Sequence, residues 1–107
     1  MIQEKLIGQL RPSTTGAEVV YTVPSNTTSI IKSIFLSNTS NSAVEYSIFV
    51  STGTTYDETT ALYFEISLAK NTSDNINTYI ALEQGNVAIK INSANDATIT
   101  LFGAEIT

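Results

Sequence analysis

Short apolar runs separated by small polar residues recur along this 107-residue chain. The clearest case is the stretch 27–50, where two runs rich in β-branched and aromatic residues flank the polar segment Asn-Thr-Ser-Asn-Ser at 38–42. This pattern is typical of a β-hairpin with a medium-length loop. No segment has a convincing helical apolar period. The chain must therefore build its core from strands.

The alternation of apolar and polar residues predicts about eight short strands and hence an all-β fold. In the second strand of the hairpin, the residues expected to face inward are Val44, Tyr46, Ile48 and Val50. In residues 61–68 the corresponding set is Leu62, Phe64, Ile66 and Leu68. Polar turns between the strands favour an antiparallel β-sandwich of about eight strands, of the jelly-roll type.

The first strand of the hairpin has apolar residues on both of its faces, which indicates a central strand or one that is partly covered on both sides. Strict alternation places one apolar set on a common face, namely Ile30, Ile34 and Leu36. It places Ile31 and Phe35 on the opposite face, beside two serines. We therefore expect Ile31 and Phe35 to contribute to an interaction surface.

The N-terminal residues are ambiguous, because their apolar members fit neither a helical nor a strand period. Pro12 disfavours a helical conformation at Arg11. We expect one domain, with a β-sandwich over residues 13–107 and an N-terminal arm or short first strand over residues 1–12. Two alternatives remain open: a strand packed on its own sandwich, or an arm that binds a neighbouring subunit. The arm would make its contacts through Ile2, Leu6, Ile7 and Leu10.

The composition argues against an enzyme. Histidine is absent, which removes the commonest general base and the usual zinc ligand. Cysteine is absent too, so no thiolate metal site can form. No Asp-x-Asp-x-Asp calcium spacing occurs, and the acids in the turns are interpreted as solvated residues: Asp57, Glu58, Asp74 and Asp96. We therefore expect no enzymatic activity, no cofactor and no metal.

The charge distribution bears on the partners of the chain. Only 14% of residues are charged, well below the roughly 25% of an average soluble domain, and such a polar surface suits contact with other proteins. The net charge is −5 and the five basic residues are dispersed, so neither nucleic acid nor an anionic membrane is an expected partner. No secretion signal or membrane-spanning run is expected either.

One small-molecule site remains a candidate. Tyr56 and Asp57 lie in the longest predicted loop, at residues 51–60, where they could contact a glycan. Glu45 and Glu65 lie on outward strand faces and could approach each other, as the two carboxylates of a glycosidase do. Two surface acids on a sheet is the simpler interpretation of that pair.

Several strand and turn segments resemble small virion proteins of tailed bacteriophages. The segments are Tyr-Thr-Val-Pro-Ser-Asn-Thr-Thr at 21–28, Lys-Ser-Ile at 32–34, Ile-Phe-Leu-Ser-Asn-Thr-Ser at 34–40, Ala-Leu-Tyr at 61–63 and Gly-Asn at 85–86. The resemblance covers roughly residues 18–106 and lies in the sequences of strands and turns, not in catalytic residues. No functional-site residue of this chain can therefore be inferred from it.

This resemblance implies a virion structural protein that is assembled in the bacterial host cytoplasm. The expected role is a capsid decoration (cement) protein that binds and stabilises the shell of major capsid protein. The alternative is a carbohydrate- or receptor-binding module of a phage tail or baseplate. In either role the partner is the major capsid protein or another virion protein. We also expect a homo-oligomer, with a trimer preferred, because capsid lattices offer threefold positions.

Overall fold

The computed structural model describes all residues 1–107 and contains eight strands and no helix. No helix is therefore present that is long and apolar enough to cross a membrane. The strands are β1 (Ile2–Leu10), β2 (Glu18–Thr22), β3 (Thr28–Asn38), β4 (Val44–Ser51), β5 (Ala61–Leu68), β6 (Ser73–Leu82), β7 (Asn86–Ile91) and β8 (Ala97–Ile106).

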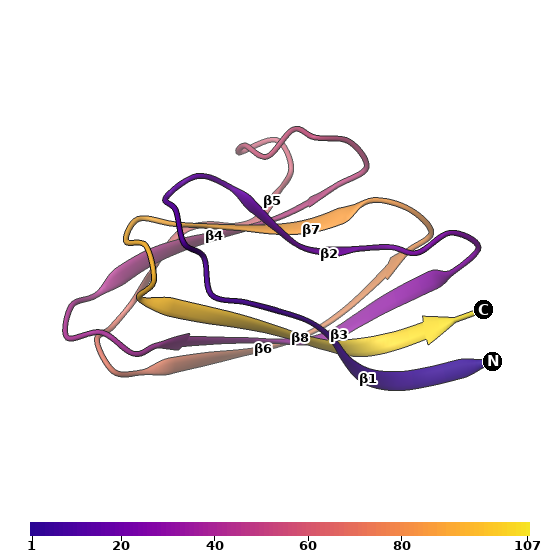
Figure 1. The fold of residues 1–107 in the computed structure, drawn as a ribbon, viewed down its shortest axis with the longest axis horizontal. Coiled ribbons are helices and arrows are strands. Elements are labelled where there is room, and N and C mark those ends of the chain that lie inside the picture. Colours follow the sequence, from indigo (N-terminus) through magenta and orange to yellow (C-terminus); the bar gives the residue numbers. More distant parts are fainter.

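The strands form two four-stranded sheets that pack face to face (Figure 1). The first, sheet A, has the order β1-β8-β3-β6, and the second, sheet B, has the order β2-β7-β4-β5. All the pairings within them are antiparallel. Every connection except β4–β5 crosses from one sheet to the other, which is the jelly-roll arrangement. The predicted fold class, an eight-stranded antiparallel β-sandwich of the jelly-roll type, is confirmed.

The predicted hairpin at residues 27–50 is wrong, because its two strands lie in different sheets. β3 pairs with β6 and β8, whereas β4 pairs with β5 and β7. The buried side chain of Asn38 holds the corner between them: its Nδ2 donates to the carbonyl oxygens of Ser42 at 2.8 Å and of Leu68 and Ala69 at 3.2 Å. Small polar residues serve such a corner as well as a hairpin loop, so the turn pattern could not distinguish the two.

The faces of β3 also differ from strict alternation. Its register shifts between Ile31 and Ser33 against both neighbouring strands: Lys32 is an extra residue relative to β8, whereas relative to β6 the extra residue lies on β6, between Asn77 and Ile80. Such a bulge reverses the sides on which the following residues point. Ile31 therefore faces inward together with Ile34 and Leu36 and is fully buried. The expected grouping of Ile31 with Phe35 is wrong for this reason.

A second irregularity changes the faces of β5. Glu65 has a φ of 52°, and the pairing of β5 with β4 is interrupted on the N-terminal side of this residue. Leu68 is buried as expected, but Leu62 and Phe64 are exposed, and Tyr63 packs against the core in their place. The alternation predicted for residues 61–68 therefore holds only at its C-terminal end.

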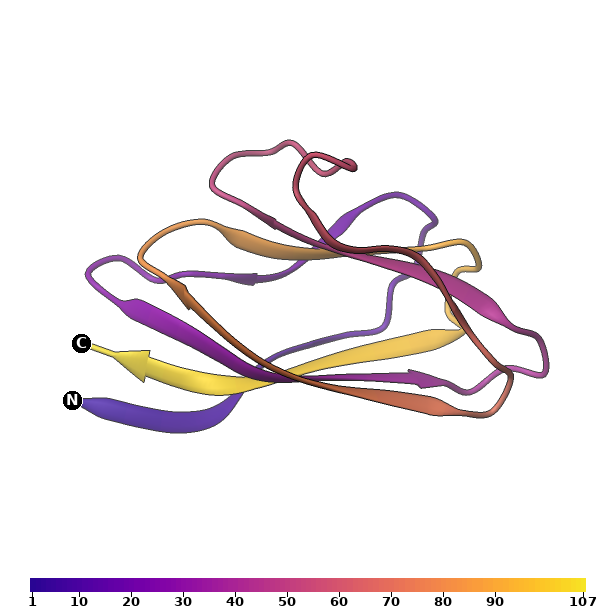
Figure 2. The same cartoon turned by 180° about the vertical axis from the view of Figure 1, so that it is seen from behind.

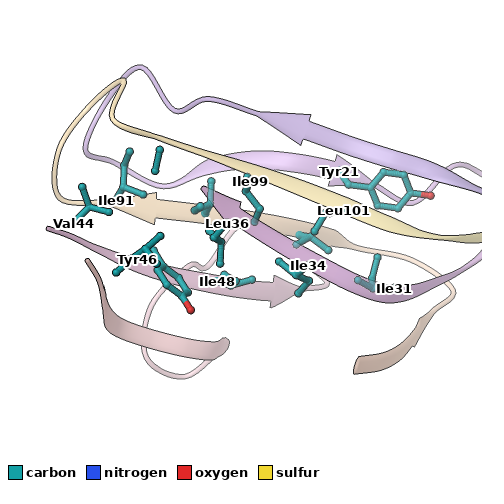
Figure 3. Close-up of a cluster of buried hydrophobic side chains, with 14 of the residues drawn as sticks. Tyr21, Ile31, Ile34, Leu36, Val44, Tyr46, Ile48, Ile91, Ile99 and Leu101 are labelled. Atoms are coloured by element: carbon teal, nitrogen blue, oxygen red, sulfur yellow. The ribbon is translucent and has the colours of Figure 1, made fainter. Parts of the chain in front are cut away.

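The core lies between the two sheets and contains 15 buried residues (Figure 3). Two tyrosines connect the sheets through their hydroxyl groups. Tyr21 in sheet B donates to Glu105 Oε2 at 2.6 Å in sheet A, and Tyr46 in sheet B donates to Asp74 Oδ2 at 3.1 Å in sheet A. Burial, together with the neighbouring carboxylate, raises the pKa of each tyrosine to about 12. Both hydroxyls therefore stay protonated and keep donating across the physiological range.

The close packing beside the β3 bulge can be tested by a substitution at Gly103 in β8. A Cβ atom at this position would lie 1.9 Å from the carbonyl oxygen of Ile30, which is backbone and cannot move aside. Gly103→Ala should therefore lower the free energy of unfolding in urea by about 1–3 kcal/mol or more. The control is Gly53→Ala, where a Cβ meets nothing within 4 Å, and its effect should stay within about 0.5 kcal/mol. Equal effects of the two substitutions would contradict this packing.

Candidate interaction surface

The outer face of sheet A carries exposed apolar side chains on three adjacent strands. Leu6 of β1 pairs directly with Phe102 of β8, and Phe102 in turn pairs with Ser33 of β3. Phe35, two residues further along β3, is a diagonal neighbour of Phe102 and within the reach of an aromatic ring. The side chain of Leu6 is 53% exposed, that of Phe35 is 41% exposed and that of Phe102 is 38% exposed.

Two further side chains extend this surface to the opposite edges of sheet A. Ile2 on β1 is 66% exposed and Tyr79 on β6 is 71% exposed. We call the set Ile2, Leu6, Phe35, Tyr79 and Phe102 the apolar face. Taking roughly 200 Å² for a large side chain, its exposed parts amount to roughly 500 Å², near the top of the roughly 300–600 Å² usual for the largest patch on a monomer.

The surroundings of the apolar face are polar and almost uncharged. The remaining residues that the registers place on this side are mostly small, hydroxyl-bearing or amide-bearing, among them Gln9, Ser33, Ser37, Asn75, Asn77, Thr98 and Thr100. The charged residues beside it are Lys32 and Glu4, which form an ion pair with each other, and Arg11, whose guanidinium donates to Thr98 Oγ1 at 2.8 Å. An apolar centre with a polar rim is the usual anatomy of a protein–protein contact.

The structure separates the six predicted interface residues into two groups. Ile2, Leu6 and Phe35 belong to the apolar face, whereas Ile31 is in the core and Ile7 and Leu10 are half-buried against it. Sequence reasoning missed Phe102 and Tyr79. Strand alternation could have found both, because Phe102 follows the buried Leu101 in β8 and Tyr79 precedes Ile80, which packs against the core, in β6.

Residues 2–10 form β1, an edge strand of sheet A that pairs with β8. Lys5 Nζ lies 2.9 Å from Glu105 Oε1. The hydrogen bond from the Tyr21 hydroxyl, followed by the Lys5 ammonium, holds the pKa of Glu105 below its ordinary value.

The two chain ends lie side by side (Figures 1 and 2) and exchange backbone hydrogen bonds of 2.8 and 2.9 Å between Met1 and Thr107. These contacts fix the position of Leu6.

The two predicted glycan contacts lie on the other side of the molecule, over the outer face of sheet B. The ring of Tyr56 packs on Phe49, with the ring centroids 6.3 Å apart and the planes tilted by 56°. The Asp57 carboxylate accepts hydrogen bonds from the backbone N–H, at 2.9 Å, and the hydroxyl of Thr59. These bonds lower the pKa of Asp57. They also hold the backbone of its own loop together, because both partners belong to residues 52–60. Both residues border a shallow cavity.

No family model matches the sequence, and no curated protein matches it. Among solved structures, a chain of the acid-stable capsid of Helicobacter pylori bacteriophage KHP30 aligns over 100% of this chain and 99% of its own length, with 14% identity and a TM-score of 0.53. The Tobacco streak virus coat protein aligns over 100% of this chain and 85% of its own length, with 8% identity and a TM-score of 0.51.

A larger viral chain gives a weaker alignment. An infectious bursal disease virus chain aligns over 98% of this chain, with 11% identity and a TM-score of 0.43. This chain spans about a third of that chain's length, because the alignment covers 32% of it. At the identities of the bacteriophage KHP30 and Tobacco streak virus alignments, what is shared is the fold. This jelly roll therefore has viral capsid proteins among its structural neighbours.

The contacts of Glu105 lead to a prediction for acid pH. Tyr21→Phe should raise the pKa of Glu105 toward its ordinary value of 4.5, because it removes the largest contribution that lowers it. A lowered folded-state pKa stabilises the fold above pH 4.5, and that stabilisation is lost as the pH falls through the folded-state pKa. The variant should therefore lose less stability over this acid range than the unmodified chain.

This prediction can be checked by an NMR titration of the Glu105 carboxyl carbon, alongside urea unfolding at each pH. The matched control is Tyr46→Phe, because Tyr46 bonds to Asp74 and not to Glu105. It should leave the pKa of Glu105 unchanged. An unchanged Glu105 titration in Tyr21→Phe would show that the hydroxyl bond does not hold this carboxylate.

Proposed function

We propose that this chain is a non-enzymatic structural protein of a virion, and specifically a capsid decoration (cement) protein of a tailed bacteriophage. Its partner is the shell of major capsid protein, on which it is deposited during assembly in the bacterial host cytoplasm. The observation that carries the proposal is the apolar face of sheet A, since the largest apolar patch on a monomer is often functional. The full-length likeness to a phage capsid chain of about the same length supports it.

The chemistry of the apolar face suits a repeated contact on a shell. Its contacts would be apolar and hydrogen-bonded, with few charges, so they would depend weakly on the salt concentration. A single contact of roughly 500 Å² is small compared with the roughly 800 Å² per partner of a standard stable interface. Many copies, or a closed oligomer that binds several sites at once, would compensate for weak single contacts.

The non-enzymatic part of the proposal has separate support. The chain has no histidine and no cysteine. Glu45 and Glu65 are exposed on sheet B, as solvated surface acids are.

We also propose that the chain forms a homo-oligomer, with a trimer preferred. Ile2 and Tyr79 are highly exposed apolar residues on the two free edges of sheet A. A contact between the β1 edge of one copy and the β6 edge of the next is head-to-tail, and such contacts form a closed ring when the rotation between copies closes. A threefold ring would match the threefold positions of a capsid lattice.

The shell-binding proposal can be tested with Leu6→Asp and Phe102→Asp. Each places an unpaired charge in the centre of the apolar face, so each should weaken binding by about tenfold or more. The assay is co-sedimentation of the purified chain with shells of the major capsid protein encoded by the same virus. Leu62→Asp is the matched control, because Leu62 is 43% exposed but belongs to sheet B. Full binding by both face variants would rule out the apolar face as the contact.

The oligomer can be tested by sedimentation equilibrium. We expect the unmodified chain to form trimers and Tyr79→Asp to shift it toward monomer, because the charge is forced against an apolar edge. Circular dichroism should show that the variant keeps its strand content, since Tyr79 is exposed. A strict monomer for the unmodified chain at every concentration would refute the oligomer and leave single copies to bind the shell.

A further inference from the structure

Two adjoining cavities lie on the outer face of sheet B. The larger has a volume of about 520 Å³, and the smaller has a volume of about 260 Å³. Phe64 and Lys90 line both, so the cavities form one continuous depression, which we call the sheet B groove. The larger cavity falls within the roughly 300–1,000 Å³ usual for small-molecule sites.

One wall of the groove is the loop of residues 52–60, which rises above sheet B in both views (Figures 1 and 2). Asn86 of β7 holds this loop, since its Nδ2 donates to the Gly53 carbonyl at 3.2 Å and to the Tyr56 hydroxyl at 3.3 Å. Within the loop, the Thr60 hydroxyl donates to the Thr55 carbonyl at 3.0 Å. The wall is therefore formed before any ligand arrives, which lowers the ordering cost of binding.

The floor of the groove offers both hydrogen-bond donors and acceptors. Glu45 on β4 and Glu65 on β5 provide carboxylate acceptors, and Lys90 on the neighbouring strand β7 provides an ammonium donor. None of the three takes part in an ion pair within 4 Å, because the two ion pairs of the chain involve other residues. Ser47 is buried in the floor, and its Oγ accepts from the Glu65 N–H at 2.9 Å. Its hydroxyl hydrogen has no acceptor within the chain and remains available to an occupant.

An exposed aromatic ring completes the lining. Phe64 is 44% exposed and borders both cavities, so that its ring can be reached along the whole groove. An apolar ligand would leave the buried Ser47 hydroxyl and the nearby charges without partners, which is unfavourable. An anion would meet Glu45 and Glu65, and a cation would meet Lys90.

We propose that the sheet B groove binds a neutral oligosaccharide. Each sugar hydroxyl both donates and accepts, which matches a lining that holds carboxylates, an ammonium and a hydroxyl together, and the C–H face of a sugar ring can pack on Phe64. The site does not depend on the proposed virion role. If that role holds, the groove lies on the sheet opposite the apolar face, so a copy bound to a shell would present it outward.

The test is a screen of the full chain against an array of neutral oligosaccharides, followed by NMR titration of ¹⁵N-labelled protein with the array's best binder. We expect saturable shifts at Ser47, Phe64, Glu65 and Lys90. Phe64→Ala should weaken the affinity by about tenfold, as the loss of an aromatic contact does, and Glu65→Gln should weaken it through the loss of an acceptor. Leu62→Ala is the control, because Leu62 is equally exposed on the same strand but does not line the groove.

Three results would overturn this proposal: no binder on the array, shifts outside the groove, or an unchanged affinity in Phe64→Ala. Tighter binding of an oligoarginine peptide than of any sugar would also reject it and assign a cationic ligand to the groove. Co-sedimentation of Phe64→Ala with capsid shells separates the two proposals. Full shell binding with lost sugar binding supports both sites, whereas sugar binding by a chain that never binds shells leaves the groove intact and rejects the decoration role.

Discussion

The bulge at Lys32 decides how the rest of the sandwich is arranged. β3 lies inside sheet A with partners on both sides, and its register shifts against both at the same point. Because one inserted residue exchanges the two faces of a strand, this shift brings Ile31 into the core and turns Phe35 outward. The core on one side of sheet A and the apolar face on its other side therefore depend on the same irregularity. The absence of a side chain at Gly103 allows the backbones to approach there.

The sequence predicted the strands well and their pairing poorly, for a physical reason. The period of two and the polar turns are local properties, so about eight strands and a sandwich could be inferred from them. Partner choice is non-local: the corner at Asn38 has the composition of a hairpin loop, but its buried amide bonds to carbonyls some 30 residues away, at Leu68 and Ala69. The bulges at Lys32 and near Glu65 carry no glycine or proline that would reveal them.

The candidate surfaces were predictable to different degrees. Ile2, Leu6 and Phe35 stood out as apolar residues without a place in the predicted core, and they are exposed on one face. The sheet B groove could not be predicted, because its lining comes from the β1–β2 loop, β4, β5 and β7. Those segments meet only through the sheet registers. Tyr56 and Asp57 were predicted as loop residues, but Phe64, which lines both cavities, was predicted to lie in the core.

The pairing of the first strand with the last has a consequence for how the protein is made. β1 has one partner in its sheet, β8, and the register joins Ile2 to Ile106 at the far ends of the chain. Such distant pairings form late and slow folding, because a long loop must close before they stabilise anything. During synthesis β1 has no partner until β8 has left the ribosome. Sheet A and its apolar face can therefore be completed only after β8 has been made, so a product that terminates before β8 cannot present this surface to other proteins.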